Sequence, residues 1–108
     1  MVTAVGSLDA TVTTHFRDVL LTEIGLRPQA VIADLSRVDF CSAQSLRVLL
    51  EASAEAHAAG VPCAVVSDQR ALQRPVTVLG VDHVLQLHRD LRAAQSWLTA
   101  LRLVEESA

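Results

Sequence analysis

The sequence predicts an α/β domain in which a mostly parallel four-stranded sheet is covered by about four helices. Residues 30–35 and 61–66 are continuous apolar runs, which are typical of strands covered on both faces. The segments around these runs instead repeat their apolar residues every three or four positions, which is the period of a helix. Strands that alternate with helices imply crossover connections and therefore a parallel sheet.

The first strand and helix follow from local patterns. Residues 2–6 are β-prone and are followed by turn formers, so we expect a short strand and a bend. Apolar side chains between residues 12 and 24 share one helical stripe, which predicts a helix. We expect Asp9 or Thr11 to cap this helix and Gly25 to end it.

The middle of the chain predicts a central strand, a loop and a second helix. The strand is the apolar run at residues 30–35. Ser42 or Ser45 is the expected helix cap, and Gly60 is the expected end. The buried stripe of this helix is predicted to contain the following residues: Leu46, Leu49, Leu50, Ser53 and His57.

The last third continues the alternation. Residues 67–79 resemble a short helix, which we expect to break near Pro75 because proline lacks an N–H group. Residues 84–88 predict a brief strand. Asp90 is the expected cap of a final helix, with Trp97 on or beside its buried stripe.

Length and composition indicate the number of domains and argue against some classes of partner. With 108 residues, half of them apolar, we expect one domain over residues 1–108. The net charge is −3 and every basic residue is Arg, without a stripe that would neutralise phosphates, so we expect no nucleic-acid partner. No segment approaches the 18 or so consecutive apolar residues of a membrane span, and we expect a soluble protein or a soluble piece of one.

The cysteines and histidines predict no metal site or other cofactor. Cys41 and Cys63 lack metal-ligand spacing, and a domain with this many apolar residues needs no disulfide, which fits the reducing cytoplasm. The four histidines lie far apart in the sequence. Asp34 lies near the end of a buried strand, where we expect it to bind backbone groups rather than act as an acid or base.

The most informative stretch is residues 38–46, where a strand gives way to a helix. Free N–H groups and the positive end of the helix dipole meet there, and such a site favours a carboxylate or a phosphate. A hydroxyl at this position can therefore act as a charge-controlled switch in a binding surface. Ser42 and Ser45 both qualify. The simpler explanation is that Ser caps the helix and stabilises it by about 1 kcal/mol, with no regulatory role.

With this loop in view, the chain resembles the STAS domains of bacterial anti-sigma factor antagonists and sulfate transporters. The matching segments are Gly-Ser-Leu-Asp at 6–9 (Gly-Glu-Leu-Asp in the family), Ala-Asp-Leu-Ser at 33–36, Val-Asp-Phe at 38–40, the leucines of 46–50, and Leu-Gly-Val-Asp at 79–82. The resemblance implies a non-catalytic domain that binds an anti-sigma factor or a histidine-kinase-like serine kinase. In the family that kinase phosphorylates the first hydroxyl residue of an Asp-Ser-Ser/Thr-Gly loop.

The family's loop falls on residues 42–45 of this chain, where the sequence is Ser-Ala-Gln-Ser. The phosphorylated position is therefore Ala43, which has no oxygen to accept a phosphoryl group. Three outcomes follow, in the order in which we favour them. The domain is permanently able to bind its partner, or it is phosphorylated at Ser42 or Ser45 instead, or it has another function. The partner-binding residues implied by the resemblance and by their place at strand ends are Asp9, Asp39, Ser42, Ala43, Gln44 and Ser45.

The resemblance also implies an extra N-terminal edge strand, for which residues 1–6 leave no room. The first strand would then have an open edge, from which we expect homodimerisation.

Two other functions compete with protein binding. Cys41 and Arg47 form the C-x5-R spacing of thiol phosphatases and sulfur transferases, but the loop between them contains no glycine to cradle a phosphate. A buried Cys41 and a solvated Arg47 explain the pair as well. A small-ligand or nucleotide-binding STAS module is the other alternative, supported by the fold resemblance alone.

Overall fold

The computed structural model describes residues 1–107, and the side chains of residues 83 and 105–107 lie outside that description. The elements follow in this order: β1 (Val2–Leu8), α1 (Thr13–Gly25), β2 (Val31–Cys41), α2 (Ala43–Ala58), β3 (Cys63–Val66), α3 (Arg70–Leu79), α4 (Asp82–Leu85), β4 (Leu87–His88) and α5 (Leu91–Ser107). All the strands are parallel and lie side by side in the order β1-β2-β3-β4. The predicted α/β fold with a parallel four-stranded sheet is confirmed.

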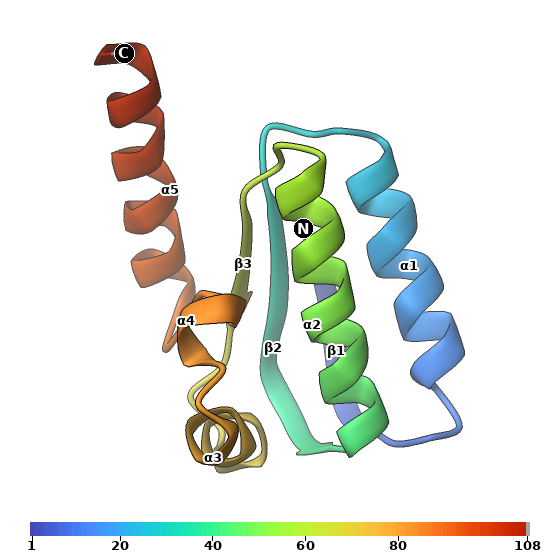
Figure 1. Ribbon diagram of the computed structural model, residues 1–108. Coiled ribbons are helices and arrows are strands. Elements are labelled where there is room, and N and C mark those ends of the chain that lie inside the picture. The colour runs from blue at the N-terminus through green and yellow to red at the C-terminus, as the bar shows by residue number, and fades with distance from the viewer. Residues whose placement is uncertain (108) are drawn as a thin grey trace.

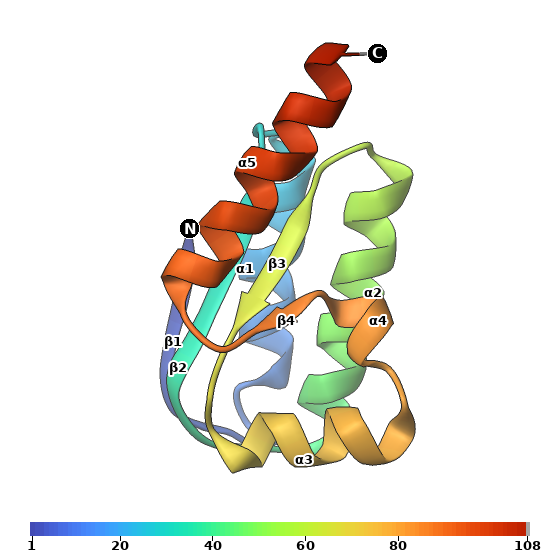
Figure 2. The same ribbon diagram turned by 90° about the vertical axis from the view of Figure 1, so that its left-hand side faces the viewer.

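The helices form layers on both faces of the sheet. Helices α1 and α2 pack side by side on one face, and α5 lies on the other face beside β3 and β4 (Figures 1 and 2). Helix α3 crosses the end of the sheet at which the strands finish (Figure 2). The first turns of α1, α2 and α3 therefore meet at one end of the domain.

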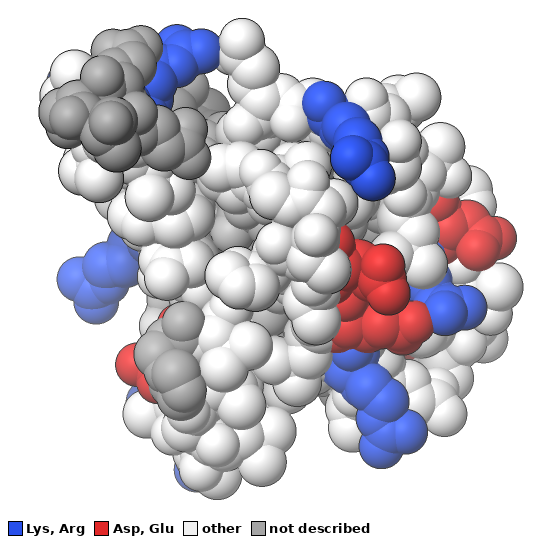
Figure 3. All heavy atoms as spheres, turned by 45° about the horizontal axis from the view of Figure 1, so that its top comes forward, with Lys and Arg blue, Asp and Glu red and all other residues white. Residues whose placement is uncertain are grey.

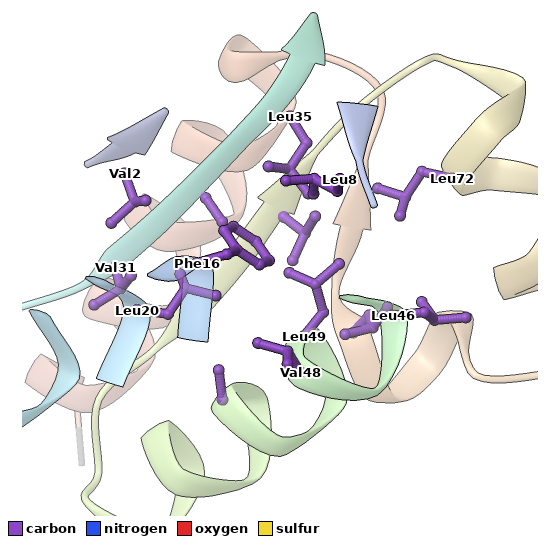
Figure 4. Close-up of a cluster of buried hydrophobic side chains, with 14 of the residues drawn as sticks. Val2, Leu8, Phe16, Leu20, Val31, Leu35, Leu46, Val48, Leu49 and Leu72 are labelled. Carbon is purple, nitrogen blue, oxygen red and sulfur yellow. The ribbon is translucent and has the colours of Figure 1, made fainter. Parts of the chain in front are cut away.

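The main core lies between the sheet and the helix pair α1 and α2. Val31, Ala33 and Leu35 alternate along β2 and point into this layer, where Phe16 and Leu49 meet them from the two helices (Figure 4). A smaller cluster lies beneath α5 on the other face, formed by Ala64, Val66 and Ala94 with Ile32 and Trp97 packed against them. Trp97 is thus a packing residue, as predicted.

Helix α2 differs in one respect from its predicted stripe. Leu46 and Leu49 are buried as expected, and Ala52 and Ala56 complete the buried row. His57, predicted to share that row, is exposed. It follows Ala56 by one residue, and a step of one residue turns the side chain away from the packed face.

Strand β2 is longer than its apolar run indicates. The prediction covered residues 30–35, whereas the strand continues to Cys41 because its second half pairs with β1. This pairing is irregular: two register shifts leave extra residues on β2, opposite the Thr3/Val5 and Gly6/Ser7 steps of β1. Such bulges bend a strand and redirect its side chains.

Two predictions for the last third were wrong. Helix α3 does not break at Pro75, which lies inside it. The buried Leu72 and Val76 hold both sides of the proline against the core, and this packing outweighs the one missing backbone hydrogen bond. Residues 84–88 do not form one strand, because the buried Leu85 ends the single turn of α4 and only Leu87–His88 pairs with β3.

Charges on the surface are mixed. Arg side chains lie among Asp and Glu side chains on the face in Figure 3, without a continuous basic stripe there. One described ion pair, Arg17 with Glu51, joins α1 to α2 at 2.5 Å between partly exposed side chains. Within the described residues, no helix has the length and apolar character needed to cross a lipid bilayer.

Candidate functional site

The candidate site lies where the strands end and the helices begin. In a parallel sheet the carboxyl ends of all strands share one edge, and the connections to the next helices gather there. Here that edge carries the β1–α1 loop, the β2–α2 junction and helix α3, all at the lower end of Figure 1. The backbone N–H of Ser42 donates to the carbonyl of Leu8 at 2.8 Å, which fixes the start of α2 to the end of β1.

The second bulge of β2 shapes the edge of this surface. Gly6 pairs with Val38 but Ser7 pairs with Phe40, so Asp39 has no direct partner on β1. The Ser7 hydroxyl donates to the Asp39 carboxylate at 3.3 Å. Asp39 and Phe40 are both exposed, and the Phe40 side chain keeps 51% of its surface in solvent. The bulge therefore presents a carboxylate and an aromatic ring beside the start of α2.

Ser42 caps α2, as predicted. Its backbone is extended, and its Oγ accepts the N–H of Ser45 at 3.1 Å, which satisfies one of the free donors at the helix start. The next two side chains, Ala43 and Gln44, are exposed. Ser45 follows with 0% exposure. The first turn of α2 thus shows a methyl group and an amide to solvent and keeps its second hydroxyl inside.

The buried Ser45 belongs to a chain of hydroxyl groups. Ser42 Oγ donates to Ser45 Oγ at 3.1 Å, and Thr13 Oγ1 donates to the carbonyl of Asp9 at 2.9 Å. Thr13 Oγ1 and Ser45 Oγ are also 3.1 Å apart. Because each hydroxyl has one proton, the proton between these two atoms must come from Ser45. The chain therefore runs from Ser42 through Ser45 and Thr13 to Asp9, and it joins the two loops of the site.

Asp9 shapes a turn rather than capping α1. Its carboxylate accepts the hydroxyl and the backbone N–H of Thr11, and these hydrogen bonds lower the pKa of Asp9. The residue before α1 is Val12, which makes no side-chain cap. The prediction that Asp9 or Thr11 caps this helix was wrong, because both side chains are used within the turn.

The structure brings together the residues that the sequence predicts for partner binding. The start of α2 contains Ser42, Ala43, Gln44 and Ser45. Asp9 is joined to it by the hydrogen bonds of Thr13. Asp39, which accepts a hydrogen bond from Ser7 of β1, lies three residues before Ser42. Sequence reasoning missed Phe40 and Thr13. Val-Asp-Phe was noted as a matching segment, but exposure of the ring depends on the bulge, which no single-strand pattern reveals.

The thiol chemistry considered from the sequence finds no support here. Cys41 is partly buried, and this burial raises the pKa of its thiol to about 11. Arg47 is exposed, and Cys41 sits at the end of β2 rather than in a loop of free N–H groups. A nucleophilic cysteine needs a lowered pKa, so Cys41 lacks the setting of a catalytic thiol.

Comparison with known proteins identifies the family. A family model described as STAS domain matches residues 1–94. The chain belongs to the STAS family. This STAS domain superposes with a TM-score of 0.80 on the crystal structure of an anti-sigma factor antagonist from Mycobacterium paratuberculosis, at 22% identity, covering 90% of this chain and 82% of that one.

A second solved structure shows the same fold. The NMR structure of the protein TM1081 matches with a TM-score of 0.75 and 16% identity, over 90% of this chain and 78% of the other. A comparison with curated proteins finds no match. The STAS fold is therefore shared, and the resemblance predicted from the sequence is confirmed. STAS domains are generally non-catalytic, and membership of this family supports a regulatory role for the domain.

Proposed function

We propose that this STAS domain is a protein-binding regulator that acts like an anti-sigma factor antagonist and binds an anti-sigma factor or a histidine-kinase-like serine kinase in the cytoplasm. The observation that supports it best is the exposed first turn of α2, where Ala43 and Gln44 lie in solvent beside Phe40. An exposed aromatic ring with small and polar neighbours is a suitable anchor for a protein partner. The binding surface comprises Asp9, Asp39, Phe40, Ser42, Ala43, Gln44 and the buried Ser45 that supports them.

The proposed regulator lacks the phosphorylation switch of its family. The exposed side chain at the family's phosphorylation position is the methyl group of Ala43. Ser45 is fully buried and its hydroxyl is held by Ser42 and Thr13, so a kinase cannot reach it in this conformation. Ser42 is half-buried and is the remaining acceptor. We therefore propose that the domain is permanently competent, with Ser42 as the alternative site of modification.

A pull-down with three forms of the protein tests the binding surface. Gln44→Arg puts bulk and charge on the exposed first turn of α2. Gln95→Arg makes the same change at an exposed position of α5, away from that turn. We expect wild type and Gln95→Arg to retain an anti-sigma factor or a histidine-kinase-like ATPase, and Gln44→Arg to lose it. Failure of all three, when a phosphorylatable STAS control retains such a protein, would refute the proposal.

A phosphorylation assay with the captured kinase and ATP tests the missing switch. Wild type should take up no phosphate, whereas Ala43→Ser restores a hydroxyl at an exposed helix start and should become phosphorylated. Mass spectrometry then locates any phosphate on the wild-type chain. Phosphate on Ser42 would support the alternative site, and phosphate on Ser45 would contradict the buried position argued above.

A small-ligand function is a second candidate, favoured by one groove. It has a volume of about 740 Å³ beside α5 and is lined by Ser53, His57, Cys63, Gln86 and Trp97 among others. Its size and mainly apolar lining with a few polar groups suit a small molecule. Native mass spectrometry of the purified protein tests this function. A bound molecule that is lost in the groove-filling variant Ala54→Trp but kept in Gln44→Arg would favour a ligand module over the protein-binding surface.

A further inference from the structure

Strand β1 is the outermost strand of the described sheet. It pairs with β2 on one side, and no described element lies beyond its other side, at the left of Figure 2. About half of the backbone N–H and C=O groups of an edge strand point away from its neighbour and are available to another chain. An open edge of seven residues is thus available for pairing.

This edge lacks the devices that usually prevent pairing. Natural edges are protected by charged residues, by proline or by bulges on the edge strand itself. The sequence of β1 is Val-Thr-Ala-Val-Gly-Ser-Leu, which contains neither a charge nor a proline. The extra residues of both register shifts lie on β2, and the positive φ of +90° at Gly6 affects only the second half of β1. Residues 2–5 remain an uncharged, β-prone edge.

The side chains of this segment suit a second strand. Val2 is buried in the core, whereas Thr3 and Val5 point to the open face and Val5 keeps 66% of its surface exposed. An antiparallel strand placed against residues 2–5 would give Val5 a neighbour on the outer face. Cross-strand pairs that contain β-branched residues stabilise a sheet.

We propose that two copies of this chain pair through residues 2–5, antiparallel about a twofold axis at Ala4, so that Val5 of one copy lies opposite Thr3 of the other on the outer face and the two sheets become continuous. A twofold axis makes the segment its own partner, and the absence of charge means that no like charges oppose each other. Residues 2–5 lie at the end of β1 away from Leu8, which contacts Ser42. The dimer leaves the start of α2 open, so this proposal does not depend on the proposed function.

Analytical ultracentrifugation over a range of concentrations tests the dimer with two variants. Val5→Lys places two like charges near the twofold axis. Val78→Lys makes the same substitution at a position of α3 that is 76% exposed. We expect a concentration-dependent dimer for wild type and Val78→Lys, and a dissociation constant raised about tenfold or more in Val5→Lys. A wild type that stays monomeric, or a Val5→Lys that dimerises equally well, would overturn the proposal.

Hydrogen exchange of the wild type gives a test that needs no variant and is unaffected by misfolding. Amides in residues 2–5 that face away from β2 exchange freely in a monomer and become protected when a second strand binds them. Their protection should rise with protein concentration while that of α3 stays constant. Protection that does not change for residues 2–5, at concentrations where the protein is dimeric, would place the interface elsewhere and refute the pairing.

Discussion

Removal of the Ser42 hydroxyl should destabilise the domain through two connected effects. In Ser42→Ala the backbone N–H of Ser45 loses its acceptor. The hydroxyl of Ser45 also loses the hydrogen bond that Ser42 Oγ donates to it, and keeps only its hydrogen bond with Thr13. Loss of a Ser cap costs 0.5–2 kcal/mol in general, typically about 1 kcal/mol. Ser45 is fully buried, so water cannot replace the lost acceptor, and we expect about 2 kcal/mol, at the upper end.

Urea unfolding followed by circular dichroism measures this effect. If the m-value is about 1.5 kcal/mol/M, a loss of about 2 kcal/mol lowers the midpoint by about 1.3 M. The m-value itself should not change. Trp97 fluorescence should give the same midpoint, which checks that unfolding is two-state.

Two control variants make the result specific to the cap. Ser42→Asp introduces the first residue of the Asp-Ser-Ser/Thr-Gly loop with which the resemblance aligns residues 42–45, and its carboxylate can accept the N–H of Ser45 at the positive end of the helix. Its stability should lie within about 0.5 kcal/mol of wild type. Ser96→Ala, at an exposed position of α5, should have no measurable effect. If Ser42→Asp loses as much stability as Ser42→Ala, the cap described here does not hold the helix start.

Three further measurements probe the packing, the thiol and the ion pair. Leu35→Ala, in the buried centre of β2, should cost 2–5 kcal/mol, whereas Val78→Ala should cost almost nothing; equal midpoints in urea would contradict the burial of Leu35. Burial raises the pKa of Cys41 from 9.0 to about 11, which leaves about a hundredfold less thiolate near pH 8. Iodoacetamide should therefore alkylate Cys41 far more slowly in the native protein than in the unfolded one. Rapid alkylation of native Cys41 would support the thiol-enzyme hypothesis instead. Arg17→Ala should lose less than about 1 kcal/mol, and less still in high salt, because the Arg17 and Glu51 side chains are both partly exposed to solvent; a larger loss that salt does not reduce would contradict this.

The fold class and the place of the site could be predicted from short stretches of sequence. The apolar runs at residues 30–35 and 61–66 and the helical stripes between them predict a parallel sheet with helices on it. Ser42 was expected to cap a helix because cap chemistry involves only neighbouring residues. The absence of a hydroxyl at Ala43 is likewise a property of one position. These features are local, so the order of the residues is enough to predict them.

Tertiary packing decided the features that join distant segments. Thr13 and Ser45 are 32 residues apart in the chain, and only the packing of α1 beside α2 brings their hydroxyls together and removes Ser45 from solvent. The exposure of Phe40 follows from the register of β2 against β1. Helix α3 continues through Pro75 because the buried residues on either side of the proline pack against the core. Register and packing arise from the fit between segments, which no pattern within one segment contains.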